Sequence, residues 1–379
     1  MNILCLDQFG ELGGAQRCLL DLLPALAERE WRVHVAAPGE GPLLECAARF
    51  GATADPIRCG PYSSGSKTIR DMVRFAADTP QLTNHIRALI SRYHADLIYV
   101  NGPRLLPAVA LALRREPPML FHAHSFLGGS ARLLAGRSLA IAGAAVVASC
   151  RFVAAPLRSY IGDRGIRVVY NGVREMPFAS RPGDGAEFRI GVIGRIAPEK
   201  GQADFVHAAR ILHRLLPQCG FVICGRPLFA DPAAMRYANA LKEMSKDLPI
   251  EFAGWREDVE EILSTLDLLV VPSSPVDATP RVILEAFAAG VPVLAFASGG
   301  IPEMIEPDVT GFLVEQRSAQ ALASAIGDLV REPSRLREVA ERARASARAR
   351  FSLERYRAEM MEAMEACVDH GRRQQPRVF

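Results

Sequence analysis

The 379-residue sequence predicts an α/β protein with two domains, each built on a parallel sheet that carries helices on both faces. Three observations support this prediction. The chain is too long for one ordinary hydrophobic core. Short apolar runs alternate with longer amphipathic segments along its whole length. The short runs are apolar without interruption, which is typical of strands buried on both faces of a parallel sheet.

The expected strands fall into two groups, one in each half of the chain. In the first half they are 2–6, 32–38, 96–101, 119–124, 144–149 and 167–171. In the second half they are 189–194, 221–225, 250–254, 266–273, 292–296 and 311–314. The amphipathic segments expected to be helices are 15–29, 81–93, 202–216, 280–289 and 318–331.

This grouping predicts the domain boundaries. The N-terminal domain is expected at 1–172, and the C-terminal domain at 189–350. A linker is expected at 173–188, where Gly, Pro and charged residues are frequent. The stretch 351–379 is expected to be a C-terminal helix that crosses back to the N-terminal domain.

Composition and charge exclude several classes of protein. Hydrophobic residues make up 49% of the chain and charged residues 23%, which is typical of a globular protein. A net charge of +3 does not indicate a nucleic-acid partner. The Arg- and Glu-rich segment from about 333 to 370 is interpreted as a solvated helix face, because acidic residues are interleaved with the basic ones.

The eight cysteines are scattered, and several lie inside apolar runs. They are interpreted as small buried residues in a reducing compartment, and not as a disulfide framework or a zinc site. The N-terminus is an apolar strand carrying Asp7 and lacks the basic leader of a signal peptide. The longest uncharged run, 138–150, is too short to span a bilayer. A cytoplasmic location is therefore expected.

Ligands of open α/β sheets bind beyond the carboxyl ends of the strands, so the loops after strands are the candidate sites. Gly13 and Gly14 follow the first strand and precede a helix, where backbone N–H groups attract anions. A simple strand-to-helix turn explains this pair equally well. Gly299 and Gly300 occupy the same position after a later strand, with Pro302 in the first turn of the next helix.

The loop after strand 189–194 carries two cations. Arg195 and Lys200 lie five residues apart and can converge on a diphosphate, Arg as a planar fork and Lys as a point charge. The alternative is a pair of solvated surface cations. The position at the carboxyl end of a strand favours the binding role, and the absence of a GK[ST] motif excludes a P-loop.

Asp277 and Glu285 lie eight residues apart around an expected helix start, with Thr279 as the expected N-cap and Pro280 as the first helical residue. A carboxylate before a helix N-terminus is favourable for purely structural reasons, which explains Asp277 without a ligand. Glu285 lies within an apolar helix, where an isolated carboxylate is costly and needs a partner. The two hydroxyls of a ribose would satisfy it.

Five segments that occur in order along the chain resemble a known family. They are GGAQ, RVVYNGV, GVIGRIAPEKG, DATPRVILEAFAAGVPVLAFASGGIPEMI and TGFLV. Together they resemble the retaining glycosyltransferases of family 4. The resemblance implies the GT-B architecture, in which two doubly wound Rossmann-like domains face a central cleft, and it implies the use of sugar nucleotides.

The resemblance also implies roles for single residues. Gly14 would approach the donor diphosphate, which Arg195 and Lys200 would neutralise. Glu285 matches the second Glu of the family's E-x7-E motif and would bind the ribose. Asp277 takes the place of the first Glu, which contacts the transferred sugar, although its side chain is one methylene shorter. The donor-binding set implied in this way comprises Gly13, Gly14, Gly194, Gly225, Glu285, Gly299, Gly300 and Ile301.

His122 and His124 lie on one face of the strand 119–124. By resemblance, His124 at the end of this strand would contact the donor sugar. An ordinary buried pair is the alternative for two His on a strand. A metal bound by this pair would need a third ligand that the sequence does not supply, and the resemblance implies neither a metal nor a cofactor.

The activity implied by the resemblance is transfer of a sugar from a nucleoside diphosphate to an acceptor hydroxyl, with retention of configuration and with Arg195, Lys200, His124 and Asp277 in catalytic roles. The partners would be a sugar nucleotide and a glycan or lipid-linked acceptor. The Gly/Ser-rich stretch 58–80 is a candidate acceptor surface or peripheral contact with the inner face of the membrane, and a plain surface loop is its alternative. A sugar-nucleotide epimerase of the same architecture and a non-catalytic sugar-nucleotide-binding protein are the competing functions. A dehydrogenase is disfavoured because DQFGELGG lacks the GxGxxG spacing.

Overall fold

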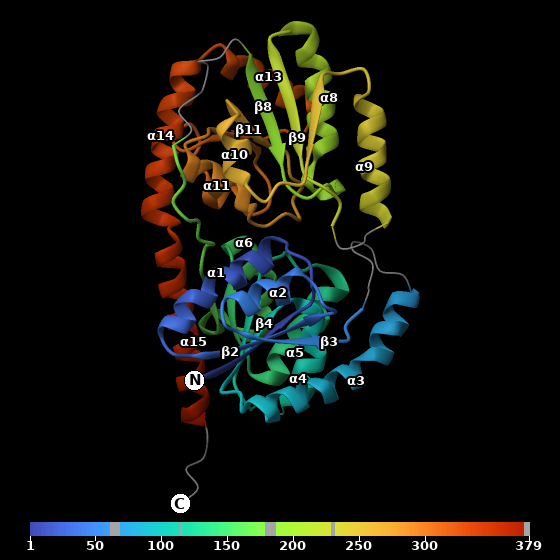
Figure 1. The fold of residues 1–379 in the computed structure, drawn as a ribbon, viewed down its shortest axis with the longest axis vertical. Coiled ribbons are helices and arrows are strands. Elements are labelled where there is room, and N and C mark those ends of the chain that lie inside the picture. The colour runs from blue at the N-terminus through green and yellow to red at the C-terminus, as the bar shows by residue number, and fades with distance from the viewer. Residues whose placement is uncertain (61–68, 114–115, 179–186, 229–231, 375–379) are drawn as a thin grey trace, which may run out of the picture. The chain divides into compact units, whose positions relative to one another are not determined.

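The computed structural model describes residues 1–60, 69–113, 116–178, 187–228 and 232–374 (Figure 1). The chain divides into two compact units. The first comprises Met1–Tyr170 together with Tyr356–Phe379, and the second comprises Asn171–Arg355. Parts of the predicted linker 173–188 and of the predicted acceptor stretch 58–80 lie outside the described residues.

The first unit is built on a seven-stranded sheet with the order β3-β2-β1-β4-β5-β6-β7. Every strand pair in it is parallel. The strands are β1 (Asn2–Asp7), β2 (Arg32–Pro38), β3 (Thr53–Ile57), β4 (Leu97–Asn101), β5 (Met119–Ala123), β6 (Ala145–Ala148) and β7 (Ile166–Val168). The α-helices are α1 (Gly14–Glu28), α2 (Pro42–Arg49), α3 (Ile69–Tyr93), α4 (Leu106–Leu113), α5 (Gly129–Ala142), α6 (Arg151–Ala154) and α7 (Arg158–Ile161).

Strand β3 was not expected from the sequence. Its residues TADPI include polar side chains and Pro56, which cannot donate to a ladder and is therefore confined to sheet edges. The strand lies at the edge of the sheet and pairs only with β2. An edge strand is less buried than a central one, so its residues need not all be apolar.

The second unit is built on a six-stranded parallel sheet with the order β10-β9-β8-β11-β12-β13. The strands are β8 (Phe188–Ile193), β9 (Cys219–Cys224), β10 (Ile250–Gly254), β11 (Leu268–Val271), β12 (Val293–Phe296) and β13 (Phe312–Val314). The α-helices are α8 (Gln202–Leu215), α9 (Pro232–Ser245), α10 (Val259–Ser264), α11 (Arg281–Ala289), α12 (Ile301–Met304), α13 (Ala319–Val330) and α14 (Pro333–Arg350). The last helix of the chain, α15 (Leu353–Gln374), begins in this unit and continues into the residues grouped with the first.

The core of the second unit shows why these segments form a layered structure. Phe205 and Leu212 of α8 and Ile326 of α13 pack into one cluster with strand residues such as Phe221 and Phe296. Figure 1 shows α8 and α13 alongside the strands of this sheet. The expected fold class, with two Rossmann-like parallel-sheet domains, is confirmed.

Two further expectations concern burial and membrane insertion. All eight cysteines are unpaired, and seven of them are buried, as expected for small apolar residues; only Cys46 is partly exposed. In the described ranges, no helix has both the length and the apolar composition needed to cross a bilayer.

Candidate functional site

The carboxyl edge of the second sheet brings together two residues that the sequence singled out. Lys200 lies in the loop after β8, and its Nζ is 2.7 Å from Oδ2 of Asp277 in the loop after β11. Their side chains are only 23% and 13% exposed. The same two loops are joined by the backbone N–H of Ser274, which donates to the carbonyl oxygen of Glu199 at 2.8 Å. Lys200 is therefore held at the edge of the sheet by a half-buried carboxylate.

Arg195 begins the loop after β8 and has partners within the same loop. Its guanidinium pairs with Glu199, four residues further on. The side-chain amide of Gln202 donates to the carbonyl oxygen of Arg195 at 2.9 Å. Sequence reasoning missed Glu199 and Gln202, although both lie in the segment that carries the two cations.

Glu285 lies on α11, and its side chain is 16% exposed. Its partner is Arg281, one turn earlier, whose Nε lies 3.8 Å from Oε1 of Glu285. This separation is longer than a hydrogen bond, so Glu285 retains capacity to accept hydroxyl donors. The sequence indicated that a carboxylate in this apolar helix needs a partner, and Arg281 on the same helix supplies one that partly compensates its charge.

The start of α11 differs from the prediction. Pro280 is the N-cap and Arg281 the first helical residue, so the helix begins one residue later than expected. Thr279 does not cap the helix. Its hydroxyl oxygen accepts a hydrogen bond of 3.2 Å from the side-chain amide of Asn171.

The loop after β12 carries Gly299, Gly300 and Ile301. The hydroxyl of Ser298 donates to the carbonyl oxygen of Ser273 at 2.6 Å, which ties this loop to the one after β11. Gly299 has φ +58°, and a Cβ placed on it would lie 2.1 Å from the carbonyl oxygen of Asp277. Only glycine permits this approach. Gly300 is the N-cap of α12, and Ile301 is its buried first residue.

Two other predicted glycines follow β8 and β9 at the same edge. The N–H of Gly194 donates to the carbonyl oxygen of Cys224 at 2.9 Å, and the N–H of Gly225 donates to that of Gly254 at 2.7 Å. These bonds continue the ladder beyond the strands. The loops after β8, β9, β11 and β12 thus gather most of the predicted residues of the second unit at one edge of its sheet.

In the first unit the predicted residues are joined by a buried network that the sequence did not reveal. Gly13 is the N-cap of α1, Gly14 is its first residue, and His124 directly follows β5. The centre of the network is Asp7, the last residue of β1, which is fully buried. The signal available in the sequence was an Asp at the end of an apolar strand that leads into a Gly-Gly loop.

The carboxylate of Asp7 accepts hydrogen bonds on both oxygens. Oδ1 accepts from the side-chain amide of Gln16 at 2.7 Å and from the N–H of Phe9 at 2.9 Å. Oδ2 accepts from the side-chain amide of Asn101 at 2.6 Å. Burial raises the pKa of Asp7 to about 6, against the opposing effect of these hydrogen bonds. The free energy of unfolding therefore decreases, as far as this group is concerned, as the pH rises from about 4 to about 6.

His122 and His124 are in ring contact, with centroids 3.8 Å apart, so the expectation that they share a face is confirmed. His122 is fully buried, and its Nδ1 lies 2.6 Å from the hydroxyl of Tyr99. Burial holds the pKa of His122 well below its usual value, so its ring is neutral. His122 is thus an ordinary buried histidine, as the alternative interpretation of the pair expected. His124 is half-buried. No group of three or more metal-ligating side chains occurs within the described residues.

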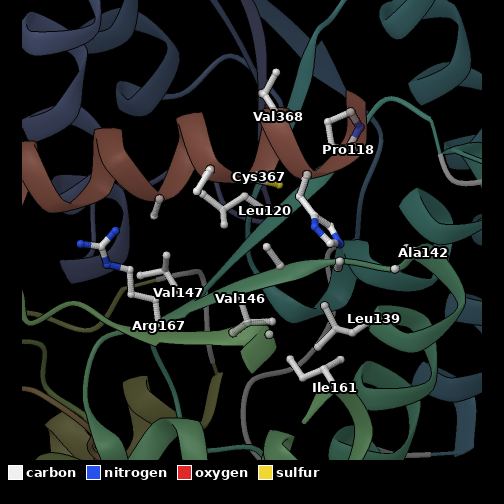
Figure 2. A pocket seen from close by; sticks show the side chains of 18 of the residues that line it. Pro118, Leu120, Leu139, Ala142, Val146, Val147, Ile161, Arg167, Cys367 and Val368 are labelled. Atoms are coloured by element: carbon white, nitrogen blue, oxygen red, sulfur yellow. The ribbon is translucent and has the colours of Figure 1, made fainter. Parts of the chain in front are cut away.

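A cavity of about 1260 Å³ lies elsewhere in the first unit (Figure 2). Apolar side chains such as Leu120, Leu139 and Val146 line it, together with residues of α15 that include Cys367 and Val368. Its lining includes residues at the amino ends of β5, β6 and β7, the opposite edge from that on which open α/β sheets bind ligands. None of the predicted site residues lines it.

The fold and the site define an α/β protein with two parallel sheets, in which glycine-rich loops, cations and carboxylates gather at the carboxyl edges. A family model described as Glycosyltransferase Family 4 matches residues 12–175, and one described as Glycosyl transferases group 1 matches residues 175–348. The chain belongs to this family of glycosyltransferases.

Named relatives are similar over part of the chain. The lipopolysaccharide 1,2-N-acetylglucosaminetransferase of Salmonella typhimurium is 24% identical over 241 residues, which are 60% of this chain and 63% of that protein. A UDP-Gal:alpha-D-GlcNAc-diphosphoundecaprenol alpha-1,3-galactosyltransferase of Escherichia coli is 28% identical over 180 residues, 44% of this chain and 46% of that protein. The chain thus spans less than two thirds of the length of these relatives.

Solved structures share the fold over nearly the whole chain. Anabaena HepE, in complex with UDP and glucose, has a TM-score of 0.80 and 24% identity, covering 97% of this chain and 100% of that one. The sucrose-phosphate synthase of Thermosynechococcus elongatus has a TM-score of 0.78 and 21% identity, covering 98% and 100%. Both confirm the two-domain architecture of the family.

Proposed function

We propose that this protein is a glycosyltransferase that transfers a sugar from a nucleoside-diphosphate sugar to an acceptor hydroxyl, with retention of anomeric configuration, in the synthesis of a glycan, polysaccharide or glycolipid. The observation that carries the proposal is the pairing of Lys200 with Asp277 beside Arg195, at the carboxyl edge of a sheet in a chain of this family. The named relatives act in lipopolysaccharide and lipid-linked glycan synthesis, which supports the acceptor class.

In the proposed reaction the bond from the anomeric carbon to the diphosphate breaks, and a bond to the acceptor oxygen forms on the same face of the sugar. The acceptor proton goes to the departing phosphate, so no strong protein base is needed. Lys200 and Arg195 stabilise the negative charge that grows on the diphosphate. The proposal assigns this role to the two cations and includes no bound metal or cofactor.

The remaining residues are proposed to bind or orient the donor. In the second unit, Glu285 accepts from the ribose hydroxyls. In the first unit, the proposed roles of Gly14 and His124 are contacts with a diphosphate and with a sugar. Asp277 has a role that the resemblance did not supply. Because its carboxylate lies 2.7 Å from Lys200, it orients that ammonium group as well as standing near the transferred sugar.

The proposal is tested with the purified protein and a panel of UDP-, GDP- and ADP-sugars. One donor is expected to raise the melting temperature, and to release its nucleotide when a suitable hydroxyl acceptor is added. The configuration of the product is read from the coupling constant of its anomeric proton. A product of inverted configuration would contradict the retaining mechanism.

The same assay separates the competing functions. An epimerase would convert the sugar nucleotide into a new one with no acceptor present. A non-catalytic binding protein would show the thermal shift and no turnover with any acceptor. Either result would replace the proposal of sugar transfer.

We further propose that the N-terminal end of α3 contacts a lipid membrane. Ile69, Met72 and Val73 are 82%, 59% and 64% exposed, and their spacing places them on one face of the helix. Apolar side chains that gather on one exposed helix face are typical of an interface. The exposed cation Arg58 lies in the same region of the chain and suits an anionic surface, whereas Arg74 lies 3.8 Å from the carboxylate of Asp78.

Liposomes that contain phosphatidylglycerol are therefore expected to sediment the protein. Replacing Ile69, Met72 and Val73 together by Ser should weaken this partitioning about tenfold or more, because burying an apolar side chain contributes ~1.5–3 kcal/mol. The control replaces Leu215 and Met235, exposed apolar residues of the second unit, by Ser. Equal binding by the triple variant and the control would refute the contact.

A further inference from the structure

The hydrogen bonds around Asp7 form a directed chain that ends on His124. An ionised carboxylate only accepts hydrogen bonds, so each group bonded to Asp7 must be a donor. On Oδ1 the donors are Gln16 and the backbone of Phe9, and on Oδ2 the donor is the side-chain amide nitrogen of Asn101. The orientation of the Asn101 amide is thereby determined by Asp7, whose bond is shorter than the one the same nitrogen makes to the carbonyl oxygen of Ala15.

The orientation of Asn101 in turn determines the proton on His124. The amide nitrogen of Asn101 donates to Asp7 and also to the carbonyl oxygen of Ala15 at 3.1 Å, so its two hydrogens are both used. Its amide oxygen, which can only accept, lies 2.8 Å from Nε2 of His124. The imidazole must therefore carry a hydrogen on Nε2.

We propose that Asp7 and Asn101 are positioning residues that fix the ring of His124 with its proton on Nε2. The proposal rests on the proposed function in one respect, since His124 is the residue expected to contact the donor sugar. With the proton held on Nε2, the other ring nitrogen, Nδ1, is an acceptor. The network also reaches the other predicted donor contact, because the side-chain oxygen of Gln16 accepts from the N–H of Gly13 at 3.1 Å.

Burying the carboxylate of Asp7 costs free energy, and this cost supports a functional reason for its presence. Asp7 is fully buried, and among the described residues it forms no ion pair with a cation. A buried carboxylate without a cation is stabilised only by its hydrogen bonds, and a neutral residue of the same shape would be cheaper to bury. The raised pKa of Asp7 reflects this cost.

The test reads the histidine ring directly and needs no donor. Protein labelled with ¹⁵N-histidine is studied by NMR at pH 8, and the His124 signals are assigned from their loss in His124→Gln. The wild-type ring is expected to be protonated on Nε2. In Asp7→Asn the new amide group has one oxygen and one nitrogen. The nitrogen should take the position of Oδ2, because only one donor, Asn101, faces that position, whereas two donors face the position of Oδ1. Asn101 is then expected to turn its amide over, which gives up its longer bond to Ala15, and the proton of His124 is expected to move to Nδ1.

Asp96→Asn is the matched control, because the carboxylate of Asp96 accepts from the backbone N–H of Asn2 at 2.7 Å, just before the first residue of β4 in the same sheet. It should leave the His124 signals unchanged. Unchanged signals in Asp7→Asn, or a wild-type ring protonated on Nδ1, would overturn the inference. If Asp7→Asn does not fold, Asn101→Ser tests the same link, since removing the acceptor should yield a mixture of the two tautomers.

Turnover provides the functional part of the test. With a donor that the wild type uses, Asp7→Asn is expected to lower kcat by about 10²-fold, the loss expected when a positioned group is misplaced. Normal turnover in a variant whose tautomer has switched would overturn the functional part of the inference. Failure of the wild type to use any donor would overturn the proposed function and leave the tautomer result standing.

Discussion

Replacing Lys200 by Met is expected to reduce sugar transfer by a factor of about 10² to 10³, the loss typical of removing one group that stabilises developing charge. Met fills the same space, so the fold should persist. Lys200 is 23% exposed, and its ammonium group is held by Asp277, so it cannot be replaced by a freely moving surface cation. Initial rates with the donor found in the screen measure the loss, and circular dichroism checks the fold.

Lys246→Met is the matched control. Lys246 belongs to the same unit and pairs with Glu243, but both side chains are largely exposed, at 60% and 72%. An exposed pair contributes little, so this variant should transfer sugar at the wild-type rate.

Arg195→Ala is expected to lose activity as Lys200→Met does. Near-normal turnover in Arg195→Ala or in Lys200→Met would remove the basis of the proposed mechanism.

A double-mutant cycle separates the two roles of Asp277. If its carboxylate acts mainly by orienting Lys200, Asp277→Asn should cost little more once Lys200 is Met. Independent contact with the sugar would instead make the two losses multiply. Asp277→Glu restores the residue of the family pattern, and improved or broadened use of donors in this variant would indicate a direct contact with the sugar.

Gly299→Ala is expected to lower the free energy of unfolding by about 2–4 kcal/mol, and to weaken donor binding as well. Two effects combine. A left-handed conformation costs a residue with a Cβ roughly 1–2 kcal/mol. In addition, the new Cβ would lie 2.1 Å from the carbonyl oxygen of Asp277, so the loop that carries Asp277 must move.

Gly254→Ala isolates the first of these effects. Gly254 is in the same unit and has φ +69°, but a Cβ placed on it meets nothing within 4 Å. Urea unfolding of both variants measures the difference. Equal losses would mean that the contact between Gly299 and Asp277 does not constrain the loop.

Most strands were predictable because their residues are buried on both faces, and that burial requires an uninterrupted apolar run such as LIYV of β4. Strand β3 could not be predicted in this way, because an edge strand with Pro56 need not be apolar throughout. The helix start at Arg281 was misplaced by one residue because Pro is compatible with both the cap and the first turn. The choice between them depended on Asn171, which engages the hydroxyl of Thr279.

In the candidate site, too, some residues were predictable from local sequence patterns and others were not predicted. Its glycines and cations were identified because they lie in loops directly after apolar strands, which is a local pattern. Glu199 was within reach of the same reasoning, because it lies in the same loop between Arg195 and Lys200. Arg281 was likewise one turn from Glu285 on the expected helix. Glu199 and Arg281 were not predicted, although each is close in sequence to a residue that was.

The sequence by itself determined the two parallel sheets, the loops that carry the candidate residues and the family. Only the tertiary structure decided which side chains meet. Lys200 and Asp277 are 77 residues apart, and Asn101 and Asp7 are 94 apart. They meet because β8 pairs with β11 and β1 pairs with β4, which brings their following loops together. Strand order arises from the packing of the whole domain, so no local spacing in the sequence encodes these two contacts.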